Sequence, residues 1–212
     1  MSDPEAVRRA GRACAAGASI LAIGGFATQV VQASTTVSDQ AWSYPWSPDT
    51  SILISLLWAV GQALLVVGVL GLRRSGAAGT TPAAHAGLVT AVAGTAMLLV
   101  GHLASLAVSH QSVDDTGPQI VGAVFGIGAA LSAIGLLLAG RATLRAGVWH
   151  GWRRFTPLAA GVWVVALLGL QFTAGLPSAV AVYALCFLAL GIALSAEAAP
   201  AAGRSLTQAQ GA

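Results

Sequence analysis

Residues 52–74 read ILISLLWAVGQALLVVGVLGLRR, an uncharged stretch that ends at Arg73 and Arg74. A helix needs about 20 apolar residues to cross the hydrocarbon layer of a bilayer, so this stretch is long enough to span it. Lipid offers no partner to a free backbone N–H or C=O, so a spanning segment is either a helix or a strand of a closed barrel. Barrel strands alternate polar and apolar residues, and the run from Leu64 to Leu72 does not. The stretch is therefore predicted to be a transmembrane helix.

The composition extends this prediction to the whole chain. Of the 212 residues, 56% are hydrophobic and 8% charged, with a mean hydropathy of +0.79, whereas soluble domains average about 25% charged residues. Five further uncharged stretches are long enough to span a bilayer, so we predict an all-α polytopic membrane bundle of six transmembrane helices. The predicted spans are 13–33, 52–72, 86–108, 120–140, 156–174 and 178–196, in a bundle at 13–197 between an N-terminal segment at 1–12 and a disordered Ala-rich tail at 198–212.

The arginines predict how the chain threads the membrane. They precede the first span, follow the second and sixth, and lie between the fourth and fifth, whereas the other connections hold aspartates or no charge. Arginines near span ends are retained on the cytoplasmic side, so both termini are predicted to be cytoplasmic and the other three loops external. Because these arginines are dispersed rather than gathered on one basic face, no nucleic-acid partner is expected. They are Arg8, Arg9, Arg12, Arg73, Arg74, Arg141, Arg145, Arg153, Arg154 and Arg204.

The first span has a second interpretation. Its basic start, its short apolar stretch and the small residues around Ala33 also fit a cleavable secretory signal. Cleavage after Ala33 would leave five spans and would change the side of the N-terminus only. The uncharged run from Ala13 to Ser38 is long for a signal, which favours a retained helix.

Glycine spacing predicts where the helices pack. Helices in lipid associate by close backbone approach at small residues. Gly87, Gly94 and Gly101 recur every seven residues on one face of the third span, and Gly122 and Gly126 form a GxxxG in the fourth. Both faces are expected to pack within the bundle, which would place the third and fourth spans at its centre. The alternative is that one of these faces mediates dimerisation.

The longest external connection contains WSYPWSP at residues 42–48, in which aromatic residues alternate with serines and prolines. The favoured interpretation is an interfacial belt, in which Trp and Tyr rings lie at headgroup depth. Trp149 and Trp152, beside arginines, would form its counterpart on the cytoplasmic side. The alternative is an ordered external cap that contacts a ligand or partner.

The predicted spans contain no Asp, Glu, Lys or Arg, which argues against ion-coupled transport, because pumps usually place such residues in the membrane. His102 is the one readily ionisable side chain deep in a span, and Gln62 and Gln171 are candidate hydrogen-bond partners on other helices. The favoured role of His102 is structural. The alternatives are a ligand-binding site formed by all three residues, a proton relay, or haem ligation, for which no second histidine lies at a similar depth.

Other patterns are weaker. His110, Asp114 and Asp115 form an external cluster whose spacing matches no zinc motif, so a hydrated acidic loop is favoured over a metal site. Cys14 and Cys186 form no CxxC and are expected to be free thiols that act as small apolar residues. No hydrolase, nucleotide or zinc-protease motif is present. We therefore predict no catalytic residue, no metal and no cofactor, and we do not expect an enzyme.

Three segments are similar to those of a known group: WSYPWSP at 42–48, GLRR at 71–74 and WRRFTPL at 152–158. Over most of residues 35–195 the chain resembles small six-span integral membrane proteins of GC-rich bacteria, to which no activity is assigned. The resemblance implies a multi-pass protein of the bacterial cytoplasmic membrane and implies no site.

Three functions remain under consideration. The leading hypothesis is a non-enzymatic accessory or scaffolding bundle, whose partners are the lipid bilayer and another membrane protein or a second copy of the chain. It is motivated by the small-residue faces and the uncharged spans. The second hypothesis is a permease or binder for a small weakly polar or lipid-like molecule, with His102, Gln62 and Gln171 at the site. An intramembrane enzyme or haem protein ranks third.

Overall fold

The computed structural model describes residues 3–171 and 173–197, and the predicted tail at 198–212 lies outside them. The all-helical prediction is confirmed, since six helices are long and apolar enough to cross a membrane. They are α1 (Pro4–Gln32), α2 (Pro48–Ser75), α3 (Pro82–Ser105), α4 (Thr116–Ala146), α5 (Thr156–Leu170) and α6 (Leu176–Glu197), with the short 3₁₀ helices η1 (Leu106–Val108) and η2 (Gly151–Phe155).

Three helices begin in the same way. Asp3, Ser47 and Thr81 are the N-caps of α1, α2 and α3, and each side-chain oxygen accepts a hydrogen bond from a backbone N–H of the first turn. Each is followed by a proline, whose fixed φ angle suits the first helical position. Because of this start, α1 begins at Pro4 and includes most of the N-terminal segment predicted at 1–12.

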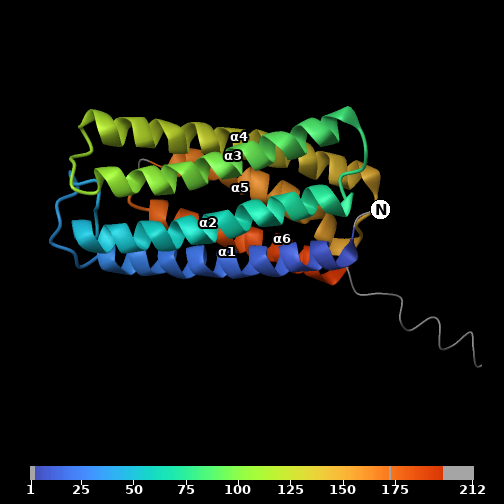
Figure 1. Cartoon of the computed structure of the whole chain (residues 1–212), viewed down its shortest axis with the longest axis horizontal. Helices are drawn as coiled ribbons and strands as arrows, with labels where there is room; N and C mark the ends of the chain where they lie inside the picture. Colours follow the sequence, from blue (N-terminus) through green and yellow to red (C-terminus); the bar gives the residue numbers. More distant parts are fainter. Residues whose placement is uncertain (1–2, 172, 198–212) are drawn as a thin grey trace, which may run out of the picture.

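The helices form a ring. Each helix packs against its neighbours in sequence, and α6 closes the ring against α1. Figure 1 shows all six helices lying along the long axis of the molecule, with α5 and α6 behind α1 to α4. The most extensive contacts join α3 to α4 and α1 to α6. Both described ends of the chain therefore reach the same end of the bundle.

The described arginines lie at that end as well. Arg73 and Arg74 are in the last turn of α2 and Arg145 is in the last turn of α4. Arg153 and Arg154 belong to η2, directly before α5. This end, where α1 also begins (Figure 1), is called the arginine end below. Its placement on the cytoplasmic side stays a prediction from the positive-inside rule.

The outer surface is apolar along the helices. Val30, Leu53 and Ile120 are 71%, 67% and 60% exposed, and each of the six helices carries large exposed apolar side chains. Soluble monomers rarely expose contiguous apolar patches larger than a few hundred Å². This surface suits contact with lipid, so the fold is consistent with a multi-pass integral membrane protein.

Two loops at the opposite end are joined to each other. Trp42 N donates a hydrogen bond to Gln111 O at 3.0 Å, and Val113 N donates to a carbonyl of the first loop at 2.8 Å. Residues 33–47 and 109–115, which contain these contacts, are called the loop cap below. These hydrogen bonds hold the two loops together as one unit, whereas the choice between an interfacial belt and a cap stays a prediction.

Candidate functional site

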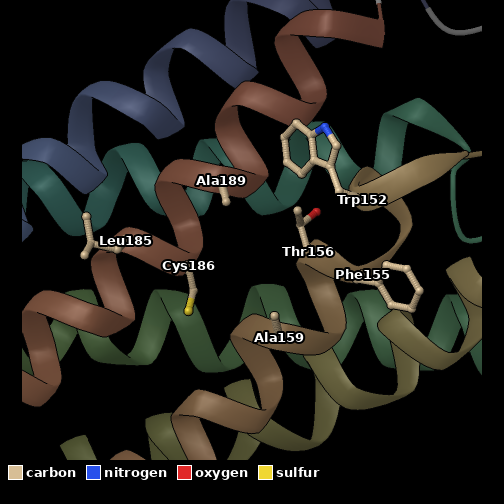
Figure 2. A pocket seen from close by; sticks show the side chains of 7 residues that line it. All are labelled: Trp152, Phe155, Thr156, Ala159, Leu185, Cys186 and Ala189. Carbon is tan, nitrogen blue, oxygen red and sulfur yellow. The ribbon is translucent and has the colours of Figure 1, made fainter.

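A groove between α5 and α6 lies beside η2, near the arginine end (Figure 2). It has a volume of about 320 Å³ and is open to the surface of the bundle. Its size falls at the lower end of the range of small-molecule sites, about 300–1,000 Å³. The residues that line it are Trp152, Phe155, Thr156, Ala159, Leu185, Cys186 and Ala189.

The groove forms where short side chains stand on both helices. Figure 2 shows Cys186 and Ala189 of α6 pointing into the gap toward α5, where Thr156 and Ala159 lie. Methyl, hydroxyl and thiol groups are too short to fill the space between the two backbones. Away from the groove the helices are joined directly, because Trp163 Nε1 donates a hydrogen bond to a backbone carbonyl of α6 at 2.8 Å.

Two arginines of η2 lie at the end of the groove. Arg153 Nε donates a hydrogen bond to Ala193 O in α6 at 3.1 Å, and its guanidinium carbon lies 5.2 Å from the centroid of the Trp149 ring. The guanidinium of Arg154 lies 4.7 Å from the ring centroid of Phe155, which itself lines the groove. Such cation–π contacts attract a guanidinium to a ring by about 0.5–1 kcal/mol at exposed sites. Cationic groups therefore border the apolar groove where it meets the arginine end.

The three residues predicted to form a ligand site come from three different helices. Gln62 lies in α2 and His102 in α3, whereas Gln171 is the C-cap residue of α5. The polar contacts of Gln62 are made with Thr95 and Tyr183 instead. Within the described part of the chain, no hydrogen bond or ring contact joins Gln62, His102 and Gln171 to one another, and a ligand site formed by them stays a prediction.

Gln62 joins three helices inside the ring. Its Nε2 atom donates hydrogen bonds to Thr95 O in α3 at 3.1 Å and to Tyr183 Oη in α6 at 3.5 Å. All three residues are buried, with Gln62 only 1% exposed. The sequence pointed to Gln62 as a polar residue in an apolar span but gave no signal for Tyr183 or Thr95, since pairing across the ring depends on the rotation of each helix.

His102 is surrounded by aromatic rings. Its ring lies edge-on to Trp58 of α2 at 5.7 Å and to Phe125 of α4 at 5.0 Å, centroid to centroid. Within the described part of the chain, the indole N–H of Trp58 has no hydrogen-bond partner. His102 thus makes ring contacts with α2 and α4, and its structural role stays a prediction.

Three of the predicted packing glycines lie against α4. A Cβ atom added at Gly87 would lie 2.7 Å from Leu138 Cβ, one at Gly94 would lie 2.7 Å from Gly128 O, and one at Gly101 would lie 2.8 Å from the Phe125 ring. These short distances show that α3 and α4 approach each other along this face.

Gly122 and Gly126 behave differently. A Cβ atom added at either position would meet no atom within 4 Å. The packing within the bundle predicted for these two glycines is therefore wrong. The reason is the rotation of α4, which directs Gly128 and Gly135 toward α3 and leaves Gly122 and Gly126 on its outer surface.

The external acidic cluster does not gather around a metal position. Within residues 3–171 and 173–197, no three His, Cys, Asp or Glu side chains lie close enough to hold a metal ion. Asp115 Oδ2 instead accepts a hydrogen bond from Ser112 N at 2.9 Å, within the loop cap. Cys14 and Cys186 are free thiols, and Cys14 Sγ donates to Phe187 O at 3.4 Å.

Comparison of the chain with protein-family models, with curated proteins and with solved structures found no match. The candidate site is therefore identified from the geometry of this chain alone.

Proposed function

We propose that this protein is a non-enzymatic membrane bundle that associates with a further transmembrane helix, from a second copy or from another membrane protein, through the outer face of α4. The observation that carries the proposal is the open position of Gly122 and Gly126. Membrane helices associate where small residues allow two backbones to approach. This face, which comprises Gly122, Ala123 and Gly126, is called the open glycine face below.

The other glycines of α4 support this proposal by contrast. An added Cβ atom would lie 2.8 Å from Gly87 O at Gly135, 3.2 Å from Gly94 O at Gly128 and 2.8 Å from Leu158 Cβ at Gly140. The glycines on the inner side of α4 thus serve helix packing. A glycine in a helix interior is unfavourable relative to alanine unless close approach requires it. A further helix would supply that requirement at the open glycine face.

The interior polar groups support a structural role rather than a reactive one. Thr95 and Thr143 donate hydrogen bonds to backbone carbonyls one turn earlier in their own helices, at 2.6 and 2.8 Å. Ser105 does the same at 3.0 Å, and Gln62 links α2 to α3 and α6. The three hydroxyls are thus satisfied within their own helices, and Gln62 is the member of this group that joins helices.

Cysteine cross-linking in native membranes tests this proposal. In a chain that lacks its two native cysteines, Ala123→Cys places a thiol on the open glycine face. Because the chain contains no lysine, a thiol-reactive reagent that carries a photoactivatable group, rather than an amine-reactive one, then captures neighbours of either kind. We expect a defined cross-linked species, and we expect Gly126→Leu to abolish it, because the larger side chain prevents close approach.

Gly169→Leu is the matched control. Gly169, in α5, is also open, with no atom within 4 Å of an added Cβ atom, so this change adds the same bulk to a different helix. It should leave the cross-linked species unchanged. Recovery of the monomer alone from Ala123→Cys membranes, or equal loss of the species in both leucine variants, would contradict the proposal.

A further inference from the structure

We propose that the groove between α5 and α6 binds one acyl chain of an anionic phospholipid, whose phosphate lies against the arginines of η2. The inference is independent of the open glycine face. It does not involve His102, Gln62 or Gln171.

The lining of the groove suits an acyl chain. Trp152, Phe155 and Leu185 supply large apolar surfaces, and the Ala159 and Ala189 methyl groups widen the gap between them. The one hydroxyl in the lining, that of Thr156, already donates a hydrogen bond to Arg153 O at 2.9 Å. The groove therefore offers apolar contact along its length and little to a polar solute.

The groove lies one helical turn from the arginines. Its lining in α6 runs from Leu185 to Ala189, which corresponds to about 6 Å along a helix axis. Arg153 is hydrogen-bonded to Ala193, one turn further toward the arginine end. The groove would thus hold the part of an acyl chain that lies next to the headgroup.

Charge complementarity selects an anionic headgroup. Arg154 is exposed and its guanidinium lies 4.7 Å from the ring of Phe155, so a positive charge stands directly beside an apolar lining residue. Arg153 is anchored to α6 and Trp149 at the same end. Guanidinium groups bind phosphate oxygens through paired hydrogen bonds, and basic pockets between transmembrane helices bind anionic lipids.

The native thiols provide a test within the unmodified chain. Cys186 lines the groove and is partly exposed, whereas Cys14 is fully buried. The full chain is placed in nanodiscs of phosphatidylcholine, with or without phosphatidylglycerol, and treated with a small membrane-permeant maleimide. Mass spectrometry then follows the modification of each cysteine. We expect phosphatidylglycerol to slow modification of Cys186, with Cys14 unreactive in both lipids.

Two variants separate the headgroup contact from the acyl-chain contact. Native mass spectrometry measures retention of phosphatidylglycerol, which Arg154→Gln should weaken about fivefold, the effect of one arginine at an anionic surface. Arg74→Gln removes the same charge from α2 and should have a smaller effect. Ala159→Leu should lower retention by filling the groove, whereas Ala166→Leu, at an exposed position of α5, should not.

Thermal unfolding of each variant shows whether it retains the fold, and Ala189→Val fills the groove from α6 should Ala159→Leu fail to fold. Equal protection of Cys186 by phosphatidylcholine and phosphatidylglycerol would overturn the selectivity for an anionic lipid. Retention that is unchanged in a folded groove-filling variant would overturn the placement of the acyl chain. Loss of retention to the same extent in Arg74→Gln and Arg154→Gln would reduce the effect to general surface charge and would also overturn the proposal.

Discussion

The inner and outer faces of α4 carry the same residue type in opposite surroundings. On the inner face, a Cβ atom at Gly135 would lie 2.8 Å from Gly87 O, and one at Gly128 would lie 3.2 Å from Gly94 O. On the outer face, Gly122 and Gly126 have no such neighbour within 4 Å. Four glycines of one helix therefore divide into a pair that the fold uses and a pair that it leaves accessible.

The difference shows that two things decide which glycines pack: the rotation of each helix and the spacing of the glycines on the helix that it faces. Gly87 and Gly94 are seven residues apart, and so are Gly128 and Gly135, so two antiparallel helices bring both pairs into register. Gly122 and Gly126 do not take part, because the rotation of α4 turns them away from α3. A GxxxG pattern indicates that a face can pack closely, but it does not indicate against which helix.

The largest effect is expected from Gly94→Leu. A side chain at this position would collide with Gly128 O, at 2.7 Å from Cβ, and with the backbone of Ser132. Because backbone atoms cannot move aside as a side chain can, we expect a loss of about 1–3 kcal/mol or more in the free energy of unfolding. Thermal unfolding in mild detergent, followed by tryptophan fluorescence, measures this change.

Gly126→Leu is the matched control for that substitution, since it adds the same side chain to the open glycine face. Its effect on unfolding of the monomer should stay within about 0.5 kcal/mol, as for other surface positions. Equal destabilisation by the two leucines would remove the distinction between the two faces of α4.

A smaller effect is expected from Gln62→Leu, which keeps the interior apolar but removes the hydrogen bonds to α3 and α6. Hydrogen bonds between membrane helices contribute about 0.6 kcal/mol on average and about 1.7 kcal/mol at most. Tyr183→Phe should cost less, because Tyr183 Oη lies 3.5 Å from Gln62 Nε2. In the Gln62→Leu background, Tyr183→Phe should have almost no further effect on unfolding, and additive losses would show that the two residues do not interact.

The sequence predicted the number and type of the helices because hydrophobic length is a local property. The span at 52–72 lies wholly within α2, and the span at 120–140 within α4. The ends are set by capping instead, which explains why α1 begins at Pro4 rather than near residue 13. The face formed by Gly87, Gly94 and Gly101 was also predictable, since a seven-residue repeat stays on one side of a helix.

The candidate site was not predictable in the same way. The groove combines η2 with α5 and α6, and no local pattern states that Ala159 and Cys186 stand opposite each other. His102 and Gln62 were recognised as unusual residues within spans, but their neighbours depend on helix rotation. A lone polar residue in a span indicates that a partner is needed, and the tertiary structure alone identifies Tyr183 as that partner for Gln62.

The smallest effect on stability is expected at the loop cap, which lies at the end of the bundle opposite the arginine end. Ala41 and Ser112 form an isolated antiparallel bridge, and residues paired in this way have Cα atoms about 4.5–5.5 Å apart, within the range that a disulfide spans. In a chain without Cys14 and Cys186, the double variant Ala41→Cys with Ser112→Cys should therefore form an intramolecular disulfide on mild oxidation. The reduced form should unfold within about 0.5 kcal/mol of its parent, because both positions lie in surface loops.

A mass difference of two hydrogens and faster gel migration report the bond, with each single-cysteine variant as control. Failure to form it would contradict the stable pairing of the two loops.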